Sequence, residues 1–165
     1  MQTKFLRNEF WYGGAVYESY KQPIGEEDSV EWDFRENPTA NQIMPLFLST
    51  KGRYIWSEKG FQIQFHKGMI QAEGDCEILL KEGYDSLRGA YLEAMKQHFP
   101  FHEIRLSKRF FEAPVYNTWI EMTFYQEQNR ILEYARGILE HGLPTGILMI
   151  DDGWSPYYGK WQFRK

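Results

Sequence analysis

The sequence predicts an α+β protein. It divides into an antiparallel β region, a helical connector and a parallel βαβ unit, over residues 1–84, 85–113 and 114–165. Three observations support this order. Phe61, Ile63 and Phe65 alternate with polar residues, a period typical of a strand with one buried face. Residues 126–141 carry apolar side chains at helical spacing, and residues 147–150 are apolar on both faces, as in a covered parallel strand.

Turn signals delimit the strands of the β region. Lys67-Gly68 is predicted to join the alternating strand to a partner over residues 69–72. Lys51-Gly52 lies between two apolar segments, residues 45–49 and 53–56, and predicts a second hairpin.

Three further segments complete the first half of the chain. A short strand is predicted over residues 77–80, and residues 23–41, rich in Glu, Asp, Pro and Asn, predict a long loop. Asp85 is predicted to cap a helix that runs to about Gln97, because Pro100 follows it.

The last fifty residues follow the order strand, helix, strand. After a connector over residues 98–113, residues 116–123 predict a strand, and Gly142 with Pro144 ends the long amphipathic helix. Because the strand at residues 147–150 follows that helix, a right-handed βαβ unit with parallel strands is expected. Two strands and one helix leave much apolar surface uncovered, so we expect a further partner for this part.

Composition excludes several classes of function. The net charge is −4 without a long basic run, so no nucleic-acid partner is expected. Cys76 has no second cysteine, and no His pair has metal-ligand spacing, so neither a metal nor a cofactor is expected. Aromatic residues reach 18%, which favours a sheet-rich core over a sugar site when taken alone.

The chain contains no apolar stretch long enough to span a membrane, so no membrane association is expected. Its first residues are too polar for a signal peptide. A cytoplasmic location is therefore expected if Met1 is the native start. A periplasmic or secreted location is expected if the sequence has been trimmed.

Two adjacent carboxylates, Asp151 and Asp152, follow the last apolar strand, with Trp154 close behind. Function in α/β proteins gathers at the carboxyl ends of strands. Carboxylates there are suited to accept hydrogen bonds from sugar hydroxyls, while an indole ring covers the apolar face of the sugar. The alternative is a polar turn in which an aspartate caps a following helix.

One segment, "APVYNTWIEMTFYQEQNRILEYARGILEHGLPTGILMIDDGWSPYYGKWQF", resembles the first two β/α steps of the catalytic barrel of glycoside hydrolase family 31. Upstream, "PLFLSTKGRYIW" is similar to a motif of that family's N-terminal β-sandwich, and Trp11-Tyr12-Gly13-Gly14 resembles its aromatic-glycine turn. The resemblance implies an antiparallel β-sandwich followed by an incomplete (β/α)8 TIM-barrel start.

The resemblance also implies a retaining α-glycosidase, an enzyme class that uses two carboxylates. In the family both are aspartates on barrel strands four and six, beyond the two strands expected here. We therefore assign no catalytic residue and expect this chain alone to be inactive.

Site residues follow from the same resemblance. It implies that Asp151 and Asp152 bind sugar hydroxyls, with Trp154 beside them and Trp119 as a second candidate for lining the pocket. A core position is equally compatible with Trp119. Asp33 aligns with a loop that reaches the sugar in the family, although a solvated loop acid is the favoured interpretation.

The substrate implied is an α-linked oligosaccharide or glycoside. Many α-glucosidases of the family carry Asp-Ile-Asp at this place, whereas Asp-Asp-Gly-Trp is similar to the acidic pair of related α-galactosidases. This favours a galactoside over a glucoside and leaves a xyloside open. Uncovered apolar surface predicts a protein partner, either the remainder of the barrel or a second copy. The alternative function is a non-catalytic carbohydrate-binding β-sandwich module.

Overall fold

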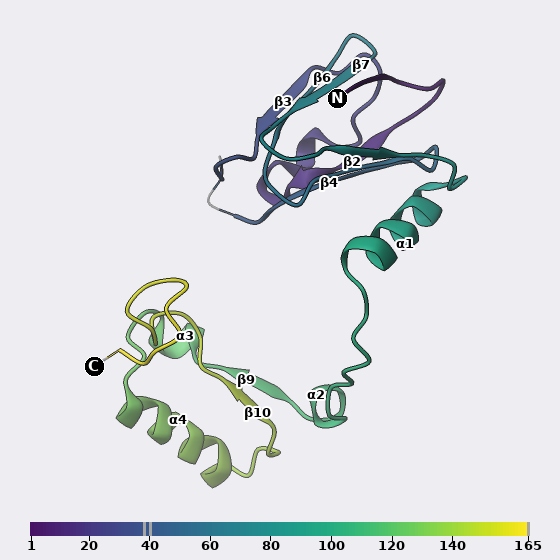
Figure 1. The fold of residues 1–165 in the computed structure, drawn as a ribbon. Helices are drawn as coiled ribbons and strands as arrows, with labels where there is room; N and C mark the ends of the chain where they lie inside the picture. The colour runs from purple at the N-terminus through teal and green to yellow at the C-terminus, as the bar shows by residue number, and fades with distance from the viewer. Residues whose placement is uncertain (38, 40, 165) are drawn as a thin grey trace. The chain divides into compact units, whose positions relative to one another are not determined.

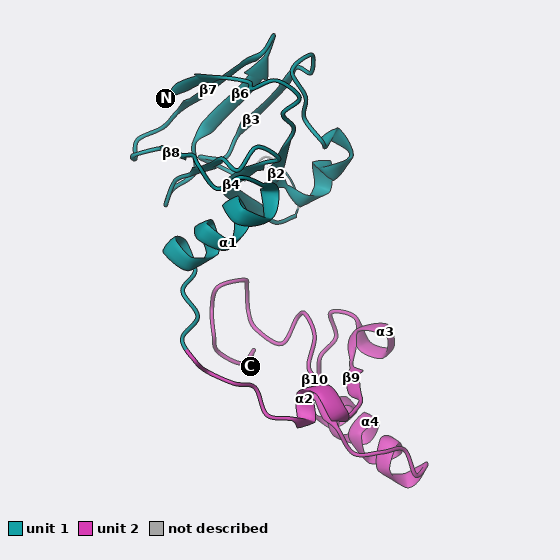
Figure 2. Ribbon diagram, turned by 90° about the vertical axis from the view of Figure 1, so that its right-hand side faces the viewer, with its two compact units in different colours: residues 1–102 teal, residues 103–165 magenta. Residues whose placement is uncertain are grey.

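The computed structural model describes residues 1–37, 39 and 41–164. The chain forms two compact units, residues 1–102 and 103–165 (Figure 2). The predicted α+β class is confirmed, since the described residues form two four-stranded antiparallel sheets, a small parallel pair and several helices (Figure 1). No barrel closes within the described part of the chain.

The first unit is built from two antiparallel sheets. One has the strand order β1-β7-β6-β3, with bounds Gln2–Lys4, Met69–Glu73, Gln62–His66 and Val30–Asp33. The other has the order β2-β4-β5-β8, with bounds Trp11–Ala15, Ile43–Ser49, Tyr54–Trp56 and Leu79–Lys81. Both hairpins predicted from the Lys-Gly turns are confirmed, because β6 pairs with β7 and β4 pairs with β5.

An aromatic core fills the space between the two sheets. Phe47 of β4 and Phe65 of β6 are fully buried, and their ring centroids lie 5.5 Å apart. Ile63 is buried on the same side of β6, while Gln62 and Gln64 face outward, as the alternation predicts. This sandwich-like packing agrees with the aromatic-rich composition, since large flat rings supply much buried area per residue.

The expected loop over residues 23–41 is wrong in part, because β3 lies inside it. Its Trp32 is buried and packs against Phe47 at 5.7 Å, so a partner from another strand stabilises a short segment in polar surroundings. The expected turn at residues 11–14 is also wrong. These residues lie in β2, whose register shifts between Gly13 and Gly14 before the short 3-10 helix η1 (Val16–Lys21).

Helix α1 (Leu87–His98) packs on the second sheet through Ala90 and Ala94. Its N-cap is Ser86, whose hydroxyl accepts a hydrogen bond from the Gly89 amide at 3.1 Å. The predicted cap, Asp85, precedes it with a φ of 62°. The error of one residue arises because both residue types are good caps and only the backbone turn distinguishes them.

The second unit contains the predicted parallel pair. Its elements are α2 (Arg109–Glu112), β9 (Val115–Asn117), α3 (Trp119–Met122), α4 (Gln128–Glu140) and β10 (Ile147–Met149). β10 pairs parallel with β9, which confirms parallel strands joined through the long helix. Gly142, with a φ of 68°, follows α4 as predicted.

One expectation for this unit is wrong. The strand predicted over residues 116–123 ends at Asn117 and gives way to α3, because the Asn117 side chain accepts a hydrogen bond from the Trp119 amide at 2.6 Å and turns the chain. The expected uncovered apolar surface is present in the described chain, since Met149 of β10 and Ile150 after it are 48% and 39% exposed. Met122 is the one buried hydrophobic residue of the described second unit.

Candidate functional site

The acidic pair lies at the carboxyl edge of the parallel strands. Asp151 and Asp152 follow β10, and Asn117 is the last residue of neighbouring β9. The Asn117 side-chain amide donates a hydrogen bond of 2.5 Å to Asp151 Oδ2, and the Asp152 amide donates one of 2.7 Å to Asp151 Oδ1. Both oxygens of Asp151 are therefore oriented by neighbouring groups.

A buried polar cluster supports this edge from below. The Thr118 hydroxyl is buried, accepts a hydrogen bond from the Asp151 amide at 3.0 Å and donates one of 2.7 Å to Gln126 Oε1. Gln126 donates in turn to the Thr123 carbonyl at 2.6 Å. Because these groups satisfy one another, the backbone at Asp151 is held in place without an unpaired buried group.

Asp152 faces a different set of neighbours. Its Oδ1 accepts from the Gly153 amide at 3.2 Å, and its Oδ2 accepts from the Tyr158 hydroxyl at 2.5 Å. The hydrogen bond to this carboxylate raises the pKa of Tyr158. Gly153 has a φ of 88°, and a Cβ there would lie 2.5 Å from the Phe124 carbonyl oxygen. The pair therefore sits in a tight polar turn, and both carboxylates remain partly exposed.

A small pocket opens beside Asp152. Its volume is about 190 Å³, and it is lined by Phe124, Asp152, Gly153, Ser155, Pro156, Tyr157, Tyr158 and Arg164. The pocket thus combines one carboxylate, two phenol rings and a guanidinium group. Arg164 also ties the segment together, because its amide donates to the Trp154 carbonyl at 2.9 Å.

The two tryptophan candidates lie outside this pocket lining. Trp154 is partly exposed and packs against Trp161 and Phe163, each with a centroid distance of 5.8 Å. Trp119 is partly exposed and meets the Phe124 ring edge-on at 5.0 Å. The structure thus brings Asp151 and Asp152 together. Trp154 follows them closely in sequence and belongs to an aromatic cluster, whereas Trp119 is connected to the pocket only through its contact with Phe124.

Three residues that hold the site were not identified from the sequence, namely Asn117, Tyr158 and Arg164. The sequence does contain a feature that indicates Asn117, because a polar residue at the end of a parallel strand lies at the same edge of the sheet as the acidic pair. Asp33, expected in a loop, instead ends β3 in the first unit. It forms a half-exposed ion pair with Arg35 whose hydrogen bonds lower the pKa of the Asp33 carboxyl.

Within residues 1–37, 39 and 41–164, no group of three or more His, Cys, Asp or Glu side chains is arranged to hold a metal ion. No described helix combines the length and apolar character needed to cross a membrane. The sequence matches no protein-family model, and no curated protein is similar enough to be a relative.

Proposed function

We propose that residues 114–165 form part of the sugar-binding site of an α-glycosidase of the glycoside hydrolase family 31 type. One observation carries the proposal: two adjacent, partly exposed carboxylates end a parallel strand beside a pocket lined by phenol rings. Carboxyl ends of parallel strands are where α/β enzymes bind their ligands.

The two carboxylates have different neighbours and are proposed to contact the sugar in different ways. Asp151 is held by Asn117 and by the Asp152 amide, so its remaining lone pairs point in a defined direction. Asp152 accepts from the exposed Tyr158 hydroxyl, which a sugar hydroxyl replaces or joins on binding. The rings of Tyr157 and Tyr158 then offer apolar faces to the sugar, with Trp154 and Trp119 as further candidates.

The finer fold belongs to the same proposal. The parallel β9–α4–β10 arrangement is compatible with the opening of a (β/α)8 barrel whose further strands cover the exposed apolar residues. A retaining glycosidase needs two carboxylates about 5 Å apart as nucleophile and acid/base. We assign neither role to a residue of this chain, which is proposed to bind a sugar and not to cleave it alone.

The test is an NMR titration of the chain with methyl α-galactoside, methyl α-glucoside and methyl α-xyloside, which measures the affinity for each sugar. A hydrogen bond to a charged group contributes roughly 1.5–3 kcal/mol, so Asp152→Asn should weaken binding by about ten- to a hundredfold. If the pair recognises the 4- and 6-hydroxyls, the loss is larger on the galactoside than on the xyloside, which lacks the 6-hydroxyl.

Asp75→Asn removes an exposed acid of the first unit and serves as the matched control. The polar-turn alternative predicts a loss of stability of about 1 kcal/mol in Asp152→Asn with binding unchanged. Equal losses on galactoside and xyloside would remove the galactoside preference. Absence of binding to all three sugars would refute the proposed site.

A further inference from the structure

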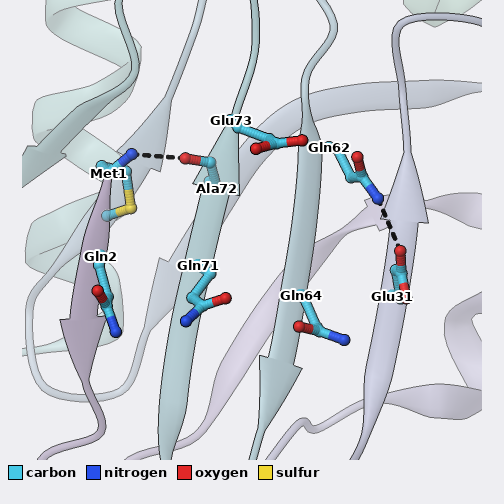
Figure 3. A pocket seen from close by; sticks show the side chains of 8 residues that line it. All are labelled: Met1, Gln2, Glu31, Gln62, Gln64, Gln71, Ala72 and Glu73. Carbon is cyan, nitrogen blue, oxygen red and sulfur yellow. Dashed lines mark hydrogen bonds between the residues drawn. The ribbon is translucent and has the colours of Figure 1, made fainter.

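A row of amide side chains crosses the outward face of the β1-β7-β6-β3 sheet. Strand pairing sets Gln2 opposite Gln71, Gln71 opposite Gln64, and Gln64 opposite Glu31. Figure 3 shows these side chains on one face of four neighbouring strands. Adjacent strands lie about 4.8 Å apart, so hydrogen-bonding groups recur at that interval across the sheet.

Most of this hydrogen-bonding capacity is unused inside the protein. Among the described residues, the side chains of Gln2, Gln64 and Gln71 have no hydrogen-bond partner. Each amide offers two donors and one acceptor oxygen. At the β3 end, Gln62 donates to Glu31 at 2.7 Å, which orients that carboxylate beside the row.

The buried core fixes the positions of the strands that carry the row. Residues next to the glutamines along β6 and β7, namely Ile63, Phe65 and Ile70, are buried in the aromatic core, so the strands cannot shift without disrupting it. Above the row is an open pocket of about 660 Å³, lined by Met1, Gln2, Glu31, Gln62, Gln64, Gln71, Ala72 and Glu73.

The chemistry of the described lining residues selects the ligand. They include two carboxylates, Glu31 and Glu73, and no aromatic side chain, which disfavours apolar surfaces. The cationic groups at the site already have partners, since the Met1 ammonium donates to the Ala72 carbonyl and Arg35 donates to Gln62 at 3.3 Å and pairs with Asp33, so the site offers little to an anionic polymer. A peptide added as a strand would use a sheet edge, not its face. A neutral chain rich in hydroxyl groups satisfies both the amides and the carboxylates.

We propose that this amide row binds a neutral oligosaccharide lying across the strands. Hydroxyl groups of successive sugars meet successive amides, because the strand spacing is close to the length of one pyranose ring. The site lies in the first unit and shares no residue with Asp151 and Asp152, so it stands or falls independently of the proposed glycosidase site.

The test is an NMR titration of the ¹⁵N-labelled full chain with maltohexaose, cellohexaose and mannohexaose. At least one of these should shift the side-chain amide signals of Gln2, Gln64 and Gln71, with saturation in the millimolar range typical of an open polar site. The double variant Gln64→Ala/Gln71→Ala removes two neutral hydrogen-bonding groups, and we expect it to weaken binding by at least about fivefold.

Two variants serve as controls. Gln97→Ala removes an exposed glutamine of α1, outside the row, and should leave the affinity unchanged. Asp152→Asn should also leave it unchanged, which separates this site from the acidic pair. Gln71→Ala alone, at an exposed position, replaces the double variant if that variant loses its native amide spectrum.

Three outcomes would overturn the proposal. These are no shift of the three amide signals with any of the neutral hexasaccharides, equal affinity in the double variant and the wild type, and tighter binding of an anionic hyaluronan hexasaccharide. A shift that disappears in Asp152→Asn would assign the binding to the other site and would also refute the amide row.

Discussion

Replacing Arg53 by Met should destabilise the first unit strongly. Its side chain is 3% exposed and forms an ion pair with Glu9, which is 0% exposed. The guanidinium also donates to Thr3 at 3.2 Å, to the Lys4 carbonyl at 2.9 Å and to Glu82 at 2.9 Å. Arg53 thus holds the first nine residues against the second sheet.

The magnitude follows from what the substitution leaves behind. Without Arg53, the Glu9 carboxylate stays buried with the Ser49 hydroxyl and the Leu6 amide as its remaining donors. Removing one partner of a buried ion pair costs about 3–5 kcal/mol. With an m-value of roughly 1.5 kcal/mol/M, the urea midpoint should fall by about 2–3 M.

The urea midpoint can be measured by monitoring tryptophan fluorescence during unfolding, since Trp11 and Trp32 are buried in the same unit. The double variant Glu9→Leu/Arg53→Met should recover part of the loss, because no charge remains buried. Asp33→Asn breaks the half-exposed pair with Arg35 and should leave the midpoint unchanged. A fall of less than about 0.5 M in Arg53→Met, or a double variant no more stable than the single one, would refute the reasoning.

The same pair predicts a pH dependence. Burial raises the pKa of Glu9, but hydrogen bonds from Arg53, Ser49 and the Leu6 amide outweigh it and hold the pKa below its ordinary value. A carboxyl with a lowered pKa contributes stability above its unfolded pKa and loses it as pH falls through the folded one. The difference in unfolding free energy between wild type and Arg53→Met should therefore become smaller below about pH 4. A difference that does not change with pH would contradict this.

Further predictions concern a histidine and two helical glycines. Burial beside Trp56 lowers the pKa of His98, so its NMR titration midpoint should be lower in the folded chain than in urea, and stability should fall as pH drops through it; equal midpoints would contradict this. In α1, a Cβ at Gly89 would lie 1.9 Å from the Tyr84 carbonyl oxygen, so Gly89→Ala should lower the thermal midpoint. Gly137 of α4 has nothing within 4 Å, so Gly137→Ala should gain up to about 1 kcal/mol; effects of the same sign at both glycines would count against this.

Local patterns were sufficient for the elements whose period is visible along the chain. The alternation in residues 61–66 indicated β6, and the apolar stripe in residues 126–141 indicated α4, which spans Gln128–Glu140. The parallel pairing of β9 and β10 followed from the order strand, helix, strand. The first two inferences needed only neighbours within a few residues, because side-chain direction repeats with a fixed period in helices and strands, and the third needed the order of the elements.

Two elements escaped the same reasoning, β3 because it depends on a distant partner and α3 because a side chain bonds to the backbone two residues later. β3 exists because Trp32 packs against Phe47 of another sheet, and α3 begins where the Asn117 side chain captures the Trp119 amide. The polar composition around β3 pointed to a loop. The residues around α3 pointed to a strand that continues to residue 123. At β3 a tertiary contact outweighed local preference, whereas at α3 a local side-chain-to-backbone hydrogen bond ended the strand.

The candidate sites divide in the same way. From the sequence alone, Asp151 and Asp152 were placed at the end of a parallel strand, since a strand and the residues after it are adjacent in the chain. The Asn117 contact to Asp151 and the alignment of Gln2 with Gln71 were decided only by the tertiary structure. Strand register joins residues that are far apart in sequence, and a shift by one residue would turn every side chain to the opposite face.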